Sequence, residues 1–483
     1  MLTQLTCRKQ PQQRDRVATA RHHREHRSTR RQHGVAKIGR AGLIGESRHA
    51  RRVPEAGVWH PRAREHRLRR YLSPTLWETS VPVFNLIDPT LATIAEKVAA
   101  GTRLSREDGI ALYASNDLLG IGQMADFARR RINGDRVYFM VNRHINPTNI
   151  CRNRCKFCAF ARNADEPGAY EMTLDEVANA AAEGAADGAY EIHIVSGLHP
   201  DWSYEFYIDM VARTRAAVPD HVIVQAFTAV EIEHMAIISK KTTREVLSDL
   251  KDAGLDALPG GGAEIFSDRT RVAAWDKKTK GDVWLRIHGE AHELGIATNC
   301  TMLYGHIETT DERIDHLILL REQQDKTGGF LAFIPLAFHA ANTELEDLPA
   351  TTGFDDLKTL AIARLMLDNI PHVKAFWIMV GLKIAQIATA FGVDDIDGTV
   401  VEERITHMAG ATTPEALSKD DLVTMITEGG RVPVERDTLY RIVKMYAEES
   451  AAPAWHAGEI GAPPLVGVAK GTVATGGHSA ATE

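Results

Sequence analysis

Three cysteines in the middle of the chain are spaced for metal chemistry. Cys151, Cys155 and Cys158 form a Cys-x3-Cys-x2-Cys run within eight residues. Thiolates are soft ligands that select iron–sulfur clusters, zinc or copper(I). Four thiolates would close a tetrahedral zinc site or complete the ligation of a cubane cluster, but the next cysteine is Cys300. Three thiolates would leave one iron of a cubane open, and an open iron can hold a substrate or a cofactor.

Two other interpretations of the cysteine run stay open at this point. The cysteines could be buried structural residues that cluster by coincidence, although free cysteines in a reducing compartment seldom cluster without metal or redox work. The run could also be a zinc knuckle in a non-enzymatic protein that binds a metal or a nucleic acid. The colour and absorbance of an iron–sulfur cluster after anaerobic purification would exclude both alternatives.

The composition limits the class of protein. The chain has 483 residues, 44% of them hydrophobic, and five cysteines, which allows a sizeable core and excludes a disulfide scaffold. No apolar run reaches the length of about 18 residues that a membrane span needs, so we expect a cytoplasmic protein without a membrane partner.

The two ends of the chain differ from its middle. The first 70 residues carry 17 Arg and 2 Lys against 5 acidic residues, although the whole chain has a net charge of −7. They show no amphipathic period, no interleaved aromatic residues and no secretory hydrophobic region. We therefore expect no nucleic-acid partner, and interpret 1–75 as a disordered or mis-assigned extension and 450–483 as a disordered tail.

The elements around the cysteine run alternate between strands and helices. Residues 80–134 read as a helical preface, 135–412 as the main domain and 413–449 as a C-terminal helical segment. Alternating strands and helices predict a parallel sheet, and eight such units predict an α/β fold of the (β/α)8 barrel type. A doubly wound open sheet is the alternative. The expected strands are 136–143, 191–195, 222–227, 257–258, 296–304, 330–336, 373–379 and 394–397.

Polar and glycine-rich loops follow these strands, where a barrel carries its active site. They hold the candidate residues Ser196, Gly197, Gly261, Gly262, Glu264, His306, His339 and Asn342. Glycines let a backbone approach a ligand closely, but they can also serve only a tight turn. Glu264 could bind the hydroxyls of a ribose, or it could be only a carboxylate that stabilises the start of a helix. His306 and His339 could contact the substrate or could be ordinary core residues.

Read together, the loops resemble the aminodeoxyfutalosine synthases, a subgroup of the radical S-adenosylmethionine (SAM) superfamily. The matching stretches are 144–160, 194–200, 259–266, 301–309, 333–343, 393–399 and 431–440. The related dehypoxanthine futalosine cyclase and the tyrosine-using half of deazaflavin F0 synthase share the cysteine loop and the Gly-Gly-Gly-Ala-Glu segment. The stretch 336–339 with Asn342 and Thr343 favours the synthase. The chain departs from the pattern at Ser196-Gly197-Leu198, where many relatives have Gly-Gly-Glu, and at Pro147, where relatives often have Tyr.

The resemblance implies a fold, a cofactor set and a reaction. It implies a radical SAM barrel in which Cys151, Cys155 and Cys158 ligate a [4Fe–4S] cluster and SAM chelates the open iron. The cofactor-binding residues would be Phe157, Ser196, Gly197, Gly261, Gly262 and Glu264. The 5′-deoxyadenosyl radical would add to the vinyl carbon of 3-[(1-carboxyvinyl)oxy]benzoate, and rearrangement with loss of the carboxyl group would give 6-amino-6-deoxyfutalosine for menaquinone biosynthesis. His306, His339 and Asn342 would serve the substrate, and a flavodoxin or ferredoxin would donate the electron.

Overall fold

The computed structural model describes residues 82–446. The expectations for 1–75 and 450–483 lie outside these residues. The first described elements are a short 3-10 helix, η1 (Pro89–Leu91), and three helices: α1 (Ala92–Ala100), α2 (Arg106–Ala114) and α3 (Leu118–Asn133). Ser105 begins α2 with a reciprocal capping box to Asp108, and Asp117 caps α3. Three helices therefore lie within 92–133, in the segment that the sequence analysis interprets as a helical preface.

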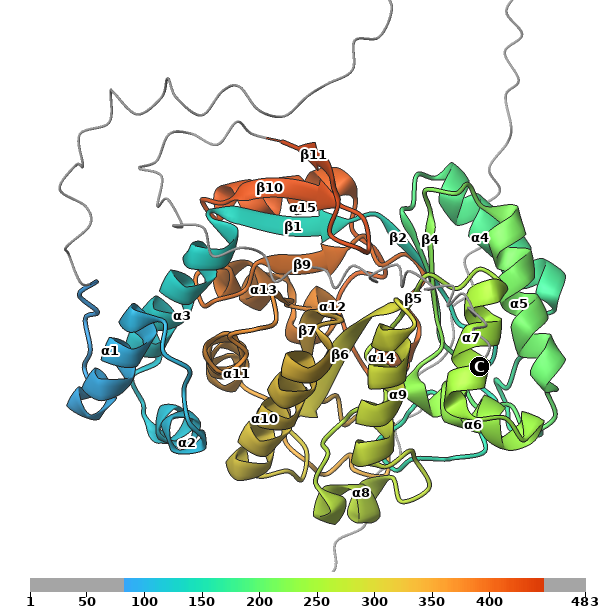
Figure 1. Cartoon of the computed structure of the whole chain (residues 1–483), viewed down its shortest axis with the longest axis horizontal. Helices are drawn as coiled ribbons and strands as arrows, with labels where there is room; N and C mark the ends of the chain where they lie inside the picture. The colour runs from blue at the N-terminus through green and yellow to red at the C-terminus, as the bar shows by residue number, and fades with distance from the viewer. Residues whose placement is uncertain (1–81, 447–483) are drawn as a thin grey trace, which may run out of the picture. The chain divides into compact units, whose positions relative to one another are not determined.

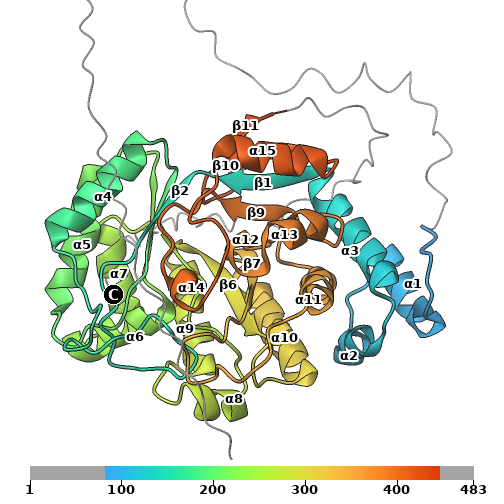
Figure 2. The ribbon, with the colours of Figure 1, turned by 180° about the vertical axis from the view of Figure 1, so that it is seen from behind.

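The main sheet has seven parallel strands in chain order, curled and covered by helices on its outer face (Figures 1 and 2). The strands are β2 (Asn142–Ile145), β3 (Glu191–Ile194), β4 (Ile223–Ala226), β5 (Ala257–Leu258), β6 (Ala297–Tyr304), β7 (Phe330–Ala337) and β8 (His372–Val373). The helices between them are α4 (Leu174–Ala186), α5 (Tyr204–Ala217), α6 (Ala229–Ser239), α7 (Thr243–Asp252), α8 (Asp268–Ala274), α9 (Gly281–Glu293), α10 (Thr310–Thr327) and α11 (Gly353–Met366). This arrangement confirms the expected barrel-type α/β fold.

An eighth segment connects the two edges of the curled sheet. It contains β9 (Asp395–Gly398), and its Asp395 pairs in parallel with Lys374, just after β8. Further along, Val401 pairs with Arg143 of β2, and its carbonyl accepts from the His144 N–H at 3.0 Å. The segment therefore occupies the place of the eighth strand between β8 and β2.

The expected first strand, 136–143, is two strands in two different sheets. β1 (Arg136–Met140) pairs with β9 and with the C-terminal strand β10 (Val432–Arg436), whereas β2 belongs to the main sheet. The smaller sheet has the order β11-β10-β1-β9, with β11 (Ile442–Met445) at its edge. An apolar strand pattern fits either sheet, so the local sequence could not reveal the change of partner.

Two other expectations about secondary structure were wrong in part. The segment 413–449 was expected to be helical, but only α15 (Lys419–Glu428) is, and β10 and β11 follow it. Pro433 cannot donate within a helix, and the neighbouring valines favour a strand. Of the expected strand 373–379, only Val373 is a strand residue, in β8; α12 (Trp377–Val380) and α13 (Leu382–Ala388) follow it, and α14 (Ile405–Met408) lies beyond β9.

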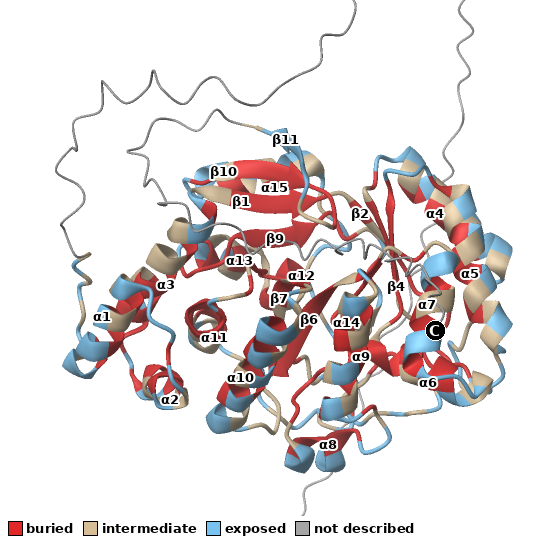
Figure 3. Cartoon of the chain, in the orientation of Figure 1, coloured by how far each residue is buried: buried red, intermediate tan, exposed pale blue. Residues whose placement is uncertain are grey.

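Apolar side chains fill the space between the main sheet and the helices. Figure 3 shows buried residues along the strands and on the inner sides of the helices, with exposed residues on the outer sides. The inside of the curled sheet is different. Barrel interiors are usually filled by branched apolar side chains, but here several inward residues are polar and line a cavity. No helix within 82–446 is long and apolar enough to cross a membrane.

Candidate functional site

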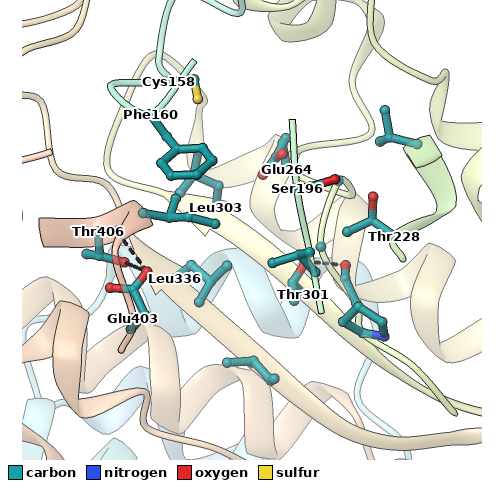
Figure 4. A pocket seen from close by; sticks show the side chains of 18 of the residues that line it. Cys158, Phe160, Ser196, Thr228, Glu264, Thr301, Leu303, Leu336, Glu403 and Thr406 are labelled. Carbon is teal, nitrogen blue, oxygen red and sulfur yellow. Dashed lines mark hydrogen bonds between the residues drawn. The ribbon is translucent and has the colours of Figure 1, made fainter. Parts of the chain in front are cut away.

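A cavity of about 360 Å3 lies inside the curled sheet. The loops that follow the strands form its walls, and Figure 4 shows side chains from several of them around it. The lining residues include Cys151, Cys155, Phe157 and Cys158 after β2, Ser196 and Gly197 after β3, Gly261, Gly262 and Glu264 after β5, and His339 after β7. Ten of the twelve residues expected from the sequence therefore meet at one cavity.

The cysteine loop is held against the cavity by backbone hydrogen bonds. The N–H of Cys151 donates to Arg162 at 3.0 Å, and the N–H of Arg152 donates to Leu198 in the neighbouring loop at 3.0 Å. The three thiols are free. Burial raises the pKa of Cys155 to about 12 and also raises that of Cys158, although backbone N–H groups of Ala161 and Phe160 oppose the second shift. Without a metal the Cys155 and Cys158 thiols stay protonated, and metal ligation would deprotonate them.

The donor set fits a three-thiolate cluster. Cys300, the other described cysteine, is fully buried in β6 with its Sγ 3.6 Å from the Ala332 carbonyl, and it does not line the cavity. Within 82–446, no three His, Cys, Asp or Glu side chains converge as a site for one metal ion. A [4Fe–4S] cluster needs no such convergence, because its thiolates are spread over a multi-iron cluster.

The glycine-rich loop after β5 is packed tightly against its neighbour. A Cβ on Gly260 would lie 2.7 Å from the Cys300 Cα atom, so only glycine fits against β6. Gly262 has a φ of +88°, which favours glycine, and Gly261 and Gly262 face the cavity. Glu264 is buried at the cavity wall, and its carboxylate accepts from the Lys278 ammonium, whose Nζ lies 5.0 Å from the Phe157 ring centre.

Ser196 and Gly197 connect the β3 loop to two other parts of the site. The Ser196 N–H and hydroxyl both donate to Glu231 Oε1, at 3.1 and 3.2 Å. Glu231 also caps α6 together with Thr228, so the spacing Thr-x-x-Glu signals the cap but not this bridge to the cavity. A Cβ on Gly197 would meet the Ile150 carbonyl oxygen at 2.4 Å, so the two loops touch through backbone.

The three residues expected to contact the substrate have different positions. His339 lines the cavity, with its Nε2 2.9 Å from the Met379 carbonyl. His306 does not line it: its ring nitrogens lie 2.9 Å from the Leu303 carbonyl and 2.8 Å from Glu308. Glu308 also accepts from the Gly305 and His306 N–H groups, which turns the loop back on itself.

Asn342 is likewise outside the cavity lining. It is exposed and donates to the Met408 carbonyl at 2.9 Å. Its φ of +61° shows that it occupies a tight turn, a conformation that Asn tolerates better than most residues. Its contact with the last residue of α14 joins the loop after β7 to that helix.

Sequence reasoning missed the polar floor of the cavity. Five polar side chains line the cavity and form this floor. Four come from strands, namely His144, His193, Gln225 and Asn299, and the fifth is Lys374, directly after β8. The imidazole rings of His144 and His193 are stacked, with centres 4.5 Å apart. Burial lowers the pKa of His144 to about 3, so that ring is neutral near pH 7. The only signal in the sequence was the polar residues within otherwise apolar strands.

The end of β10 and the residues that follow it contact side chains behind this floor. Thr438 Oγ1 donates to Glu191 Oε2 at 2.8 Å, and Glu191 Oε1 lies 3.3 Å from His193 Nδ1. Arg436 Nε donates to Asp395 in the eighth segment at 2.6 Å. The Thr438–Glu191 contact joins residues more than 200 positions apart, and together these contacts fix the side chains behind the floor.

Comparison with known proteins decides the family. Residues 145–320 match the model of the Radical SAM superfamily, and residues 327–449 match the CofH/MqnC C-terminal region. The chain is 48% identical to an aminodeoxyfutalosine synthase of Thermus thermophilus, over 74% of this chain and 97% of the relative. It belongs to the radical SAM superfamily. This membership, inferred from the cysteine run and its loops, is confirmed.

Other members of the superfamily are similar over the same region. An aminodeoxyfutalosine synthase of Streptomyces coelicolor is 45% identical, over 73% of this chain and 94% of the relative. A 5-amino-6-(D-ribitylamino)uracil–L-tyrosine 4-hydroxyphenyl transferase of Methanopyrus kandleri is 41% identical, over 73% of this chain and 95% of the relative. The crystal structure of methylornithine synthase (PylB) shares the fold, with a TM-score of 0.55 at 17% identity over 70% of this chain and 96% of that one.

Membership makes the protein a radical SAM enzyme and implies a [4Fe–4S] cluster and SAM. The three free thiols on the cavity wall are consistent with that cofactor set. The glycine-rich loop and Glu264 line the same cavity as the thiols, which leaves room for a ligand between them.

Proposed function

We propose that this radical SAM enzyme is an aminodeoxyfutalosine synthase of menaquinone biosynthesis. It would transfer the 5′-deoxyadenosyl group of SAM to 3-[(1-carboxyvinyl)oxy]benzoate, with release of methionine. Rearrangement and loss of the enolpyruvyl carboxyl group would then form 6-amino-6-deoxyfutalosine. The observation that carries the proposal is the similarity to two aminodeoxyfutalosine synthases, at 48% and 45% identity over nearly their whole length. The 41% identity to a tyrosine-using transferase makes that activity the alternative, together with the dehypoxanthine futalosine cyclase.

In this proposal the walls near the cysteine loop hold the cofactors. Cys151, Cys155 and Cys158 would ligate the [4Fe–4S] cluster, which when bound supplies the electron that cleaves SAM. Glu264 can accept hydrogen bonds from ribose hydroxyls while it keeps its Lys278 partner, because a carboxylate has four acceptor sites. The remaining cofactor contacts would come from Phe157, Ser196, Gly197, Gly261 and Gly262. The electron would come from a flavodoxin or ferredoxin.

The other walls suit the aromatic part of the substrate. Apolar side chains line the cavity between the cysteine loop and the polar floor, namely Phe160, Leu303, Ile334, Leu336, Phe338 and Phe376. They can pack on a benzoate ring and exclude water from the reacting carbon. His339 stands at this wall with its Nε2 held by a backbone carbonyl, and we propose that it positions the enolpyruvyl group.

The experiment that tests the proposal is anaerobic reconstitution of the cluster, followed by incubation with SAM, dithionite and 3-[(1-carboxyvinyl)oxy]benzoate. Mass spectrometry should show a product that contains the adenosyl group joined to the benzoate carbon skeleton. Release of free 5′-deoxyadenosine in stoichiometric yield, without an adenosylated product, would instead indicate hydrogen abstraction, as expected of the cyclase. Parallel incubations with dehypoxanthine futalosine, and with tyrosine plus 5-amino-6-(D-ribitylamino)uracil, test the alternatives.

A further inference from the structure

The polar floor of the cavity holds a buried cation with unused donors. Lys374 is 3% exposed, and its ammonium has three N–H groups. Within the described chain, its only side-chain acceptor is Asp397 Oδ1, at 3.3 Å. Two N–H groups are therefore left at the cavity. A buried ammonium that lacks acceptors is costly, so an acceptor on a ligand would be stabilised there.

A second donor follows from the hydrogen bonds of His193. Glu191 is ionised, because its pKa is lowered to about 2: burial would raise it, but its interaction with His193, the nearby Lys374 ammonium and the hydrogen bond from Thr438 outweigh burial. His193 Nδ1 must then carry a proton and donate to Glu191, at 3.3 Å. The Gln225 amide group that lies 3.0 Å from the same Nδ1 must be the oxygen, because an N–H cannot donate to an N–H.

This orientation determines what Asn299 presents to the cavity. With its oxygen toward His193, Gln225 turns its NH2 toward Asn299, whose amide lies 3.4 Å away. Asn299 must then accept with its oxygen. The Asn299 NH2 then takes the other amide position, which is buried and has no hydrogen-bond partner in the protein. Asn299 itself lines the cavity and is 4% exposed. The unpaired amide atom is thereby explained as a donor that waits for a ligand.

The acidic residues around the cavity do not compete for these donors. Apart from Asp397, which already holds Lys374, each carboxylate has donors of its own in the protein. These pairs are Glu191 with His193 and Thr438, Glu231 with Ser196 and Thr228, Glu264 with Lys278, and Glu403 with Thr406. The hydrogen-bonding groups without a partner at the floor are therefore mainly donors, and these donors favour a ligand with acceptors, such as a carboxylate.

We propose that the floor is a carboxylate subsite, in which Lys374 and Asn299 donate to the ring carboxylate of the aromatic substrate. This inference rests on the proposed function, which supplies a substrate with two carboxylates. The vinyl carbon must face the cysteine loop, where the deoxyadenosyl group arises. The ring carboxylate, which is meta to the enol ether, can then point away from that loop and toward the floor.

The test is equilibrium binding to oxidised holoenzyme that holds SAM, so that no turnover occurs. Titration calorimetry compares 3-[(1-carboxyvinyl)oxy]benzoate with an analogue in which a carboxamide replaces the ring carboxylate. The wild type should bind the acid about 10- to 100-fold more tightly than the amide. Lys374→Met should lose this preference, whereas its iron content and its affinity for SAM should stay unchanged.

Two further variants separate recognition from folding. Lys374→Met leaves Asp397 buried without its cation, so the double variant Lys374→Met/Asp397→Asn removes both charges and should show the same loss. Lys358→Met is the matched control: its half-buried ammonium donates to the Tyr113 and Ser115 carbonyls, and the residue does not line the cavity. It should keep the full preference for the acid.

The outcomes distinguish this subsite from the proposed function. A preference for the acid that survives in both Lys374 variants would overturn the subsite, as would a wild type that binds acid and amide equally. If the wild type binds the acid with the expected preference but forms no adenosylated product, the proposed function fails while the carboxylate subsite stands. A preference that is lost in both Lys374 variants and kept in Lys358→Met supports the subsite.

Discussion

Replacement of Gly197 by alanine should disrupt the cysteine loop without replacing any cysteine. The added Cβ would lie 2.4 Å from the Ile150 carbonyl oxygen and 3.1 Å from the Cys151 Cβ, whereas ordinary contact begins at 3.4 Å. The carbonyl must therefore recede by about 1 Å. It cannot move freely, because the Gly197 N–H donates to Thr148 at 2.9 Å and the Arg152 N–H donates to Leu198 at 3.0 Å.

The expected cost follows from this geometry. Overpacking of this kind destabilises a fold by about 1–3 kcal/mol. A displacement of about 1 Å at Cys151, the first of the proposed cluster ligands, should lower turnover about 100-fold. Chemical denaturation measures the first quantity. Iron and sulfide per chain after anaerobic reconstitution, together with single-turnover product formation, measure the second.

A matched glycine controls for the substitution itself. A Cβ on Gly289, inside α9, would meet only the end of the flexible Gln323 side chain, at 2.8 Å. Gly289→Ala should change stability by no more than about 1 kcal/mol, with a gain expected from the better helix propensity of alanine. If Gly197→Ala keeps wild-type iron content and turnover, the inferred contact between the two loops is wrong.

Four further predictions address ligation, cofactor binding, the floor and pH. Cys151→Ala should abolish iron binding and turnover, whereas Cys300→Ala should keep near-normal iron; loss of iron in the second variant would overturn the ligand assignment. Glu264→Gln should raise the SAM concentration needed for half-maximal turnover about 10- to 100-fold at unchanged iron content, and an unchanged value would contradict a ribose contact. Thr438→Val should weaken binding of the aromatic substrate about 5- to 10-fold through loss of one hydrogen bond, and Thr438→Ser should restore it; equal affinities in both would refute the positioning role. Burial lowers the pKa of His292 to about 4 in the folded protein. As the pH falls below about 6.5, the unfolded chain therefore binds a proton at this residue before the folded protein does. The free energy of unfolding should then decline by up to about 1.4 kcal/mol per pH unit until about pH 4. His292→Gln should flatten this decline in urea denaturation, and an identical slope would exclude the contribution.

Local chemistry in the sequence was sufficient for the cysteine loop and for most of the elements. The spacing of Cys151, Cys155 and Cys158 by itself indicates a site for a soft metal ion or an iron–sulfur cluster, because thiolates so close in sequence must be close in space. Capping patterns such as Ser105 with Asp108 and Thr173 with Glu176 locate helices through bonds between residues three apart. Strand alternation then predicts which loops share the carboxyl end of the sheet, and ten of the twelve expected residues do meet there.

Only the tertiary structure decided which strands pair and which polar side chains face the cavity. The apolar pattern of 136–143 fits both sheets, and the division between β1 and β2 depends on partners such as β10, about 300 residues away. His306 and Lys374 show the same limit from opposite directions. His306 has the residue type and loop position of a ligand but bonds to its own loop, whereas Lys374 lies at the end of a buried strand and reaches the cavity. Spacing along the chain specifies contacts over a few residues, but the direction of an inward side chain depends on the shear and closure of the whole sheet.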